Sequence, residues 1–167
     1  DPSGLVSERN VLRYLPAKSI LRAEGDWAMA DLLTIAAAAV AGGEFKEDPK
    51  AGRLVRVAPG QSPDYAVNTP LITLSVDRHL PAEVAEWAQT YGFDLVKQSS
   101  AEFLESVAAA DPVDEVRVRA LGTSRAAIQE ALGGDLRAAI WDGPATVAAR
   151  VEALPFLHEQ AVSITNH

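Results

Sequence analysis

The sequence predicts an α/β fold: a Rossmann-like, mainly parallel sheet with helices on both faces, plus a β-flap formed by the N- and C-terminal strands. Two observations support this prediction. Within the chain, short apolar runs typical of strands alternate with amphipathic stretches long enough for helices, which implies right-handed crossovers. At the ends, residues 7–16 and 158–167 alternate apolar and polar residues, as half-buried strands do. We therefore expect β-flap strands in residues 1–17 and 157–167, and a Rossmann-like core in residues 18–156.

The two end strands are expected to pair with each other or with a partner, because two lone strands do not form a stable sheet unaided. Both segments also stop abruptly, which indicates that the chain is a piece of a larger protein.

The first strand of the predicted core is Ser19–Ala23, and Gly25 ends it. Asp26 is a good N-cap for the next helix, because its carboxylate can accept hydrogen bonds from the free N–H groups of the first turn. That helix is expected to end at Gly42-Gly43 in a left-handed cap. Its expected apolar face comprises Met29, Leu32, Leu33, Ala36 and Val40.

Short strands are expected at residues 44–47 and 54–57, within a region where residues 51–67 have no clear pattern. The clearest buried strand is residues 71–76. A helix follows it, with Pro81 in the first turn and Gly92 as the cap. The apolar stripe of this helix comprises Leu80, Val84, Trp87, Ala88 and Tyr91.

The second half of the core repeats the same alternation. After a short strand at residues 94–97, Ser99 and Glu102 have the spacing of a capping box, and Asp111-Pro112 breaks the helix that they begin. That helix carries Phe103, Leu104 and Val107. The remaining expected elements are a strand at 116–121, a helix at 123–132 ended by Gly133-Gly134, a strand at 137–141 and a helix at 144–154 with Val147, Val151 and Leu154 on its apolar face.

Composition narrows the possible functions. With 167 residues and 48% hydrophobic residues, the chain is long enough for one domain with a core. The net charge of −8 and the lack of a basic cluster argue against nucleic-acid binding. The longest apolar run, residues 32–41, is too short to span a membrane, and neither end has a signal-peptide pattern. The expectation is a soluble, cytoplasmic domain. Because there is no cysteine, it holds neither a disulfide nor a thiol nucleophile.

The sequence predicts no catalytic, cofactor-binding or metal-binding residue. The turn after the first strand has one glycine and the two carboxylates Glu24 and Asp26, which would repel a pyrophosphate. No metal-ligand spacing links the three histidines, His79, His158 and His167. An acid–base pair of Asp142 with His158 is less favoured than a strand-to-helix turn at Asp142. Core packing is the favoured role of Trp27, Trp87 and Trp141.

Two alternatives remain open at the level of the residues. One is a free-standing Rossmann-like domain that binds a small ligand or a nucleotide with unusual geometry. The other is an independent enzyme that uses Glu24 and Asp26, which lie at the carboxyl end of the first strand.

The two ends carry a family resemblance. The segment Ser-Glu-Arg-Asn-Val-Leu-Arg-Tyr-Leu-Pro at residues 7–16, with the strand and alanine-rich helix that follow, resembles the C-terminal region of proline utilization A. Residues 159–167 are similar to the C-terminal strand motif of that family, and residues 140–143 to its strand-ending turn. The family comprises bifunctional bacterial enzymes that join proline dehydrogenase to 1-pyrroline-5-carboxylate (glutamate semialdehyde) dehydrogenase. The resemblance runs along nearly the whole chain, and residues 52–68 match no family pattern.

In the longer family members this region is similar to an aldehyde dehydrogenase superfamily domain that has lost its chemistry. The resemblance implies a non-catalytic domain whose flap covers the aldehyde dehydrogenase site and seals the tunnel that channels the intermediate between the two active sites. The implied partner is an aldehyde dehydrogenase domain of the same or a neighbouring chain. FAD and NAD would belong to the parent oxidoreductase, not to this segment.

On this view the flap supplies the contact residues. The expected interfacial hydrogen-bonding residues are Arg9, Arg13 and Gln160, and the expected apolar anchors are Tyr14, Val162 and Ile164. Val11, Ser163 and Thr165 complete the expected interface. The competing interpretation is that these residues only stabilise the edge of their own domain.

Overall fold

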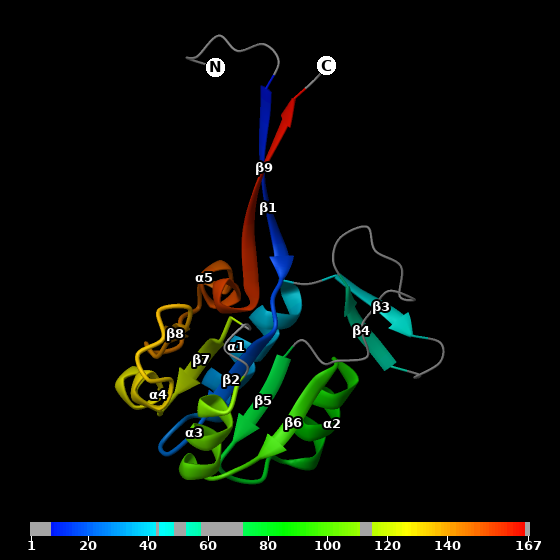
Figure 1. Ribbon diagram of the computed structural model, residues 1–167. Coiled ribbons are helices and arrows are strands. Elements are labelled where there is room, and N and C mark those ends of the chain that lie inside the picture. The colour runs from blue at the N-terminus through cyan, green and yellow to red at the C-terminus, as the bar shows by residue number, and fades with distance from the viewer. Residues whose placement is uncertain (1–7, 43, 49–52, 58–71, 111–114, 166–167) are drawn as a thin grey trace.

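The computed structural model describes residues 8–42, 44–48, 53–57, 72–110 and 115–165. It consists of an α/β core from which a long two-stranded ribbon rises (Figure 1). The α/β class and the mainly parallel sheet predicted from the sequence are confirmed.

The core sheet has five strands, and all neighbouring pairs are parallel. Its spatial order is β6-β5-β2-β7-β8, so the chain first builds outward on one side of β2 and then on the other. The strands are β2 (Ser19–Ala23), β5 (Ile72–Val76), β6 (Phe93–Lys97), β7 (Arg117–Leu121) and β8 (Ala139–Trp141).

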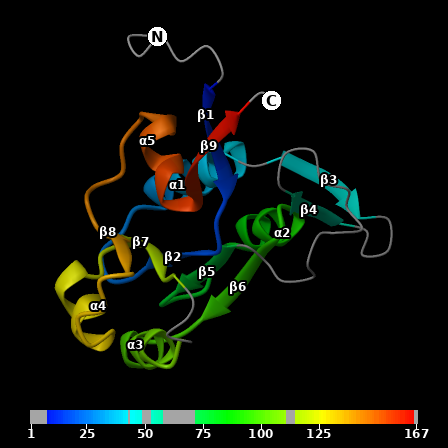
Figure 2. The same cartoon turned by 45° about the horizontal axis from the view of Figure 1, so that its top comes forward.

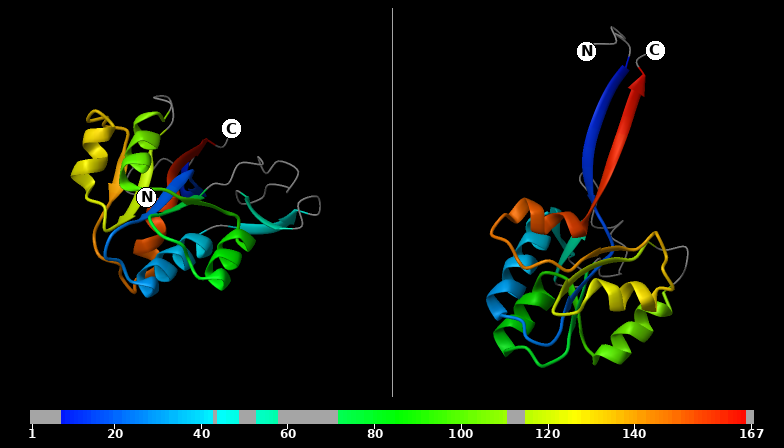
Figure 3. Two further views of the ribbon diagram at one scale, coloured as in Figure 1. Left: turned by 90° about the horizontal axis from the view of Figure 1, so that it is seen from below. Right: turned by 90° about the vertical axis from the view of Figure 1, so that its left-hand side faces the viewer.

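Helices cover both faces of this sheet (Figure 3). Apolar residues of α1 and α2 join those of β2 and β5 in one buried cluster, whereas α3 and α4 form a second cluster with β7 and β8. The helices are α1 (Met29–Ala41), α2 (Ala82–Thr90), α3 (Ser100–Ala108), α4 (Arg125–Ala131) and α5 (Ala149–Ala153), followed by the 3-10 turn η2 (Leu154–Phe156).

Two antiparallel strand pairs lie outside the core sheet. The first joins β1 (Glu8–Pro16) to β9 (Leu157–Thr165), and we call this pair the terminal ribbon. The second joins β3 (Glu44–Asp48) to β4 (Arg53–Val57), both predicted from the sequence. Figure 2 shows the two pairs on separate parts of the core, so the terminal ribbon is a separate projection.

Local signals placed several elements correctly. The capping box at the start of α3 is present: Ser99 Oγ accepts from the N–H of Glu102, and the Glu102 carboxylate accepts from the N–H of Ser99. Gly92 follows α2 with a positive φ of 76°, as expected of a glycine cap. The predicted break at Asp111-Pro112 lies outside the described residues.

The predicted start of α1 is wrong. Asp26 is not its N-cap: α1 begins at Met29, and its N-cap Ala28 makes no side-chain capping bond. The turn before α1 is held instead by Asp77, which accepts from the N–H of Gly25 at 2.7 Å. The carboxylate that binds a backbone N–H in this turn therefore comes from the end of a neighbouring strand.

The predicted end of α1 is confirmed, because the helix ends at Ala41 and Gly42 is its C-cap. Gly42 itself is right-handed, with φ −75° and ψ −4°, and Gly43, the other residue of the predicted left-handed cap, lies outside the described residues. The predicted apolar face of α1 is partly wrong. Leu33 is exposed, whereas Ile35 and Ala39 are fully buried against the sheet. The core-facing stripe is thus rotated relative to the predicted one.

The last predicted helix, residues 144–154, differs most. Helix α5 spans only Ala149–Ala153, and the predicted apolar face is turned outward, with Val151 52% exposed. Val147 and Leu154 are exposed as well. The buried residues of α5 are Glu152 and Ala153. Glu152 is 2% exposed and points inward, where its carboxylate forms an ion pair with Arg119.

Candidate functional site

The terminal ribbon is the first candidate site, because the sequence places its expected interface there. The strands pair residue by residue from Glu8 opposite Thr165 to Pro16 opposite Leu157. Directly opposed residues share a face of an antiparallel pair, and successive residues alternate between faces. The register therefore divides the predicted interface residues. Arg9, Val11, Arg13, Gln160, Val162 and Ile164 share one face, which we call the Val11 face, and Tyr14, Ser163 and Thr165 lie on the other.

Tyr14 is the member of this set whose side chain the structure describes. It is 45% exposed, and its hydroxyl donates to the carboxylate of Glu159, the opposed residue, at 3.2 Å. This hydrogen bond raises the pKa of Tyr14 above its ordinary value, because the carboxylate favours the protonated phenol. The pair fixes an aromatic side chain at the surface of the ribbon, near its base.

The base of the ribbon is anchored to the core by Arg117 of β7. Its guanidinium donates to the carbonyl oxygens of Leu154, Pro155 and Leu157 at 3.2, 3.1 and 2.8 Å. Glu115 binds both Arg117, at 2.6 Å, and His158 of β9, at 3.0 Å. Directly after β1, the N–H of Ala17 donates to the carbonyl oxygen of Phe156 at 2.9 Å. The ribbon therefore leaves the core in a fixed direction.

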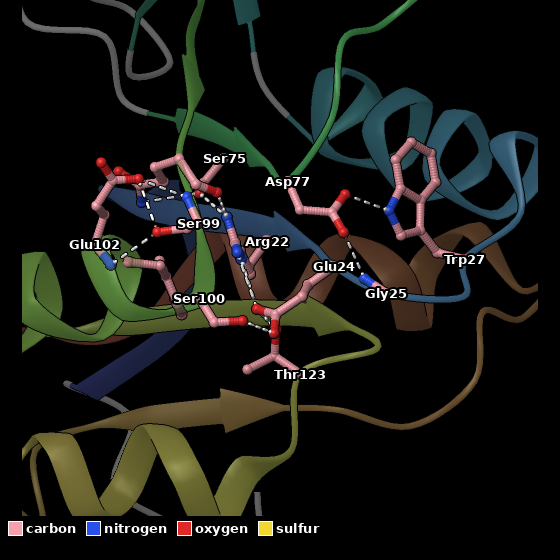
Figure 4. Close-up of polar contacts among 12 residues, drawn as sticks. Arg22, Glu24, Gly25, Trp27, Ser75, Asp77, Ser99, Ser100, Glu102 and Thr123 are labelled. Atoms are coloured by element: carbon pink, nitrogen blue, oxygen red, sulfur yellow. Dashed lines mark hydrogen bonds and ion pairs between the residues drawn. The ribbon is translucent and has the colours of Figure 1, made fainter.

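The second candidate site is the carboxyl edge of the sheet. In doubly wound α/β folds, ligands bind where the strand order reverses, here between the ends of β2 and β7. Figure 4 shows a polar network at this place. Its centre is the carboxylate of Glu24, which accepts from Arg22 Nη2 at 2.9 Å, from Thr123 Oγ1 at 2.8 Å and from Ser100 Oγ.

The Glu24 carboxyl is held in its charged form. Burial raises its pKa, but the hydrogen bonds from Ser100, Arg22 and Thr123 together outweigh burial, so the pKa lies below its ordinary value. Its donors are the side chains of Arg22, Ser100 and Thr123. The arrangement is that of an anion already bound to its donors, not of a free general base.

The backbones of the two strand ends also touch. The N–H of Glu24 donates to the carbonyl oxygen of Leu121 at 2.9 Å. Gly122 has a φ of 84°, and a Cβ atom there would overlap the carbonyl group of Glu24. The ends of β2 and β7 are therefore in direct backbone contact at the switch point of the sheet.

Asp77 and Arg78, which follow β5, brace the turn before α1. Asp77 accepts from the Gly25 N–H and from the indole N–H of Trp27 at 3.2 Å. Arg78 donates to the carbonyl oxygens of Gly25 and Trp27 and lies 4.0 Å from the Trp27 ring centroid. Burial raises the pKa of Asp77, but the hydrogen bonds from Gly25 and Trp27 hold it below its ordinary value. Asp77 and Arg78 therefore hold the turn between β2 and α1 in place.

Other polar residues considered from the sequence lie apart. Asp142 accepts from the N–H of Arg125 at the start of α4, while His158 binds Glu115, so the two do not form a pair. His79 Nε2 lies 2.9 Å from Lys97 Nζ. Among the described residues, no group of three or more His, Cys, Asp or Glu side chains could hold a metal ion. No helix in the described part of the chain is long and apolar enough to cross a membrane.

The three tryptophans lie in separate places: Trp27 and Trp87 pack in the core as predicted, whereas Trp141 belongs to neither core cluster. Trp27 is 6% exposed and packs under Arg78. Trp87 stacks with Tyr91 and Phe93, at ring-centroid distances of 5.1 and 5.8 Å. Trp141 lies under Arg117. They do not form one stacking platform for a ligand.

Two buried arginines were not predicted from the sequence pattern. Arg22 is 0% exposed and Arg119 3% exposed, although both are charged residues within core strands. An arginine inside an otherwise apolar strand is itself a signal, because a buried guanidinium requires a charged or carbonyl partner. The partner of Arg119 is 33 residues away along the chain, which the pattern of the strand does not reveal.

The fold and these sites define a Rossmann-like α/β domain with an appended two-stranded ribbon. No protein-family model matches the chain, and a search of curated proteins finds no match. Among solved structures, the chain is similar to proline utilization A (PutA) from Corynebacterium freiburgense, with 24% sequence identity and a TM-score of 0.43. The match covers 100% of this chain but 11% of that one. A TM-score this low does not establish a common fold, so the likeness assigns the chain to no family.

Proposed function

We propose that this chain is a non-catalytic C-terminal domain of a bifunctional proline-catabolic enzyme, which converts proline to glutamate through 1-pyrroline-5-carboxylate. In this role the terminal ribbon packs over an aldehyde dehydrogenase domain, covers its site and seals the tunnel that channels the intermediate. The observation that carries the proposal is the pairing of β1 with β9, because these are the segments that bear the specific sequence resemblance.

The ribbon has the properties of a docking element. It contains two strands of nine residues each and projects away from the core (Figures 1 and 3). A two-stranded antiparallel ribbon is marginal by itself in water, and its outer edges offer unpaired backbone groups to another strand. Packing against a second domain would stabilise the ribbon and cover that domain at the same time.

The anchoring of the ribbon supports the same role. Arg117 and the Glu115–His158 pair fix its base, so the direction in which it projects is determined by the core. A lid that excludes water from a tunnel must keep its position, since escape of a reactive aldehyde competes with its transfer. The Val11 face is the surface that we assign to the neighbouring domain.

The carboxyl edge of the sheet supports a structural role for the core. Glu24, Asp77 and the Gly122 turn contact other groups of the chain at the carboxyl edge of the sheet, the edge where ligands approach in doubly wound folds. In the proposed role, the core holds the ribbon and the dehydrogenase domain supplies the reacting groups and NAD.

The test uses the longer enzyme with and without this segment. We expect its deletion to lower aldehyde-dependent NAD reduction and proline-to-glutamate flux, and we expect the separately added chain to restore part of both. The control is a full-length enzyme with Leu136→Asp. Leu136 is exposed on the surface of the α/β domain and lies outside the ribbon strands, so this variant should keep wild-type rates. Wild-type rates of NAD reduction and of proline-to-glutamate flux after deletion would contradict the proposal.

The strand order favours one alternative, a free-standing domain that binds a small ligand or nucleotide, because ligands bind at such switch points. Calorimetry of the 167-residue chain with NAD, FAD and ATP separates the two functions. Saturable binding would support the alternative and would count against the lid.

A further inference from the structure

We propose that Arg22, Ser100 and Thr123 form a binding site for a small carboxylate anion, and that the side chain of Glu24 occupies this site as an internal ligand. The inference concerns the core and is independent of the role of the ribbon. It predicts that the chain binds a free carboxylate once the Glu24 side chain is shortened.

The donors converge from three separate elements. Arg22 lies on β2, Ser100 is the first residue of α3, and Thr123 follows β7. Arg22 donates from both Nε, at 3.2 Å, and Nη2, at 2.9 Å, to Glu24 Oε2. Thr123 Oγ1 donates to the same oxygen and Ser100 Oγ to Oε1, so both carboxylate oxygens have donors (Figure 4).

The buried positive charge of Arg22 requires a negative charge beside it. Its side chain is 0% exposed, and its other described contacts are neutral: Ser75 Oγ at 2.9 Å, the Gln98 carbonyl oxygen at 3.0 Å and the Phe103 ring at 4.7 Å. A buried cation without a counter-charge is strongly unfavourable. Shortening Glu24 therefore leaves a positive site that a small anion can neutralise.

The site is held in place by contacts that do not involve Glu24. The guanidinium of Arg22 is fixed by Ser75 and the Gln98 backbone, and Gln98 Nε2 donates to the same Ser75 oxygen. The capping box of Ser99 and Glu102 fixes the first turn of α3, where Ser100 lies. The donors thus keep their arrangement when the carboxylate is removed, and binding requires little reordering.

An entry path exists as well. The Glu24 side chain is 20% exposed, so its removal opens the site to solvent at the carboxyl edge of the sheet. Replacing glutamate with alanine removes roughly the volume of acetate. We therefore choose acetate as the probe. Chloride, an anion without a carboxylate group, is the reference at equal ionic strength.

The experiment measures urea unfolding of Glu24→Ala in sodium acetate and in sodium chloride. We expect Glu24→Ala to be less stable than wild type in chloride. Acetate at ten times its dissociation constant, within a range up to about 100 mM, should shift the folding equilibrium about tenfold toward the native state. Wild type, whose site is filled, should not respond. An equal response of Glu24→Ala to both salts would overturn the proposal.

Three further variants make the result specific. Adding Thr123→Val to Glu24→Ala should weaken the acetate response, because one donor to the anion is lost. Glu105→Ala removes an exposed carboxylate from the same helix, outside its capping box, and should gain nothing from acetate. Glu24→Gln fills the site with a neutral group, so a response to acetate as large as that of Glu24→Ala would contradict site occupancy.

The proposal remains testable if Glu24→Ala is unfolded in chloride. Recovery of a cooperative unfolding transition in acetate would then support it. If the variant stays unfolded in acetate at every concentration tested, the proposal is wrong.

Discussion

The guanidinium of Arg119 on β7 and the carboxylate of Glu152 on α5 form a buried ion pair, with Nε–Oε2 at 2.9 Å and Nη2–Oε1 at 3.2 Å. Both side chains are under 5% exposed. Arg119 also donates to the carbonyl oxygen of Gly143 at 2.8 Å, and Glu152 accepts from the N–H of Thr146 at 2.8 Å. The pair therefore fixes the segment between β8 and α5 and turns the apolar side of α5 outward.

Glu152→Ala should destabilise the chain by about 3–5 kcal/mol, because it leaves the buried Arg119 without its counter-charge. Urea unfolding monitored by circular dichroism measures the loss. The control on the same helix is Arg150→Ala, an exposed residue whose removal should change stability by no more than about 0.5 kcal/mol. Equal effects of the two variants would show that the ion pair does not hold α5.

Gly122→Ala should destabilise by roughly 2–4 kcal/mol, because its Cβ would overlap the Glu24 carbonyl group in addition to the left-handed backbone strain. Gly134 is the matched control: its φ of 77° is similar, but nothing lies within 4 Å of an added Cβ. Gly134→Ala should therefore cost about 1 kcal/mol from the backbone alone. Chemical denaturation compares them, and equal losses would contradict the close approach of β2 and β7.

Stability should fall in acid partly through Glu24. Its folded-state pKa lies below the ordinary value of 4.5, so its stabilising contribution is complete above that pH and is lost as pH falls through the folded-state pKa. Unfolding free energies from about pH 6 to about pH 3 should therefore depend less on pH in Glu24→Gln than in wild type. A wild-type slope in Glu24→Gln would refute this assignment.

A charge on the Val11 face should impair the proposed longer enzyme. Val11→Asp or Ile164→Asp would place a carboxylate in the docked surface and lower aldehyde-dependent NAD reduction on the order of tenfold. Ala161→Asp, on the opposite face by the register, is the matched control and should have a smaller effect. The melting temperature of the isolated chain should change little in the first two variants. Unchanged kinetics with a large fall in melting temperature would mean that these residues only stabilise their own ribbon.

Much of the fold could be predicted from local sequence. The strands of the parallel sheet are short apolar runs separated by amphipathic helices, and Ser99 with Glu102 marks the start of α3 within four residues. The alternating ends likewise predicted the strands that pair as β1 and β9. These features depend on neighbours along the chain, so their patterns are present in the sequence itself. The proposed interface role of the ribbon stays a prediction.

The sites depended on tertiary structure. The sequence pattern predicted Asp26 as the α1 cap, but no side chain caps α1 at Ala28, and Asp77, 52 residues from Gly25, holds the preceding turn. The apolar pattern also predicted that Val147, Val151 and Leu154 face the core. These three residues are exposed, and Glu152 faces inward instead, paired with Arg119. The Glu24 network likewise joins residues up to 99 positions apart.

The sequence by itself determined the order and type of most elements, because periodicity, caps and turns are set by residues a few positions apart. Tertiary structure alone decided which charged side chains are buried and which partners they meet. The physical reason is that a buried guanidinium or carboxylate is stable only beside an opposite charge or hydrogen-bonding groups. In this chain, folding brings those groups together from strands, helices and turns that are distant along the sequence.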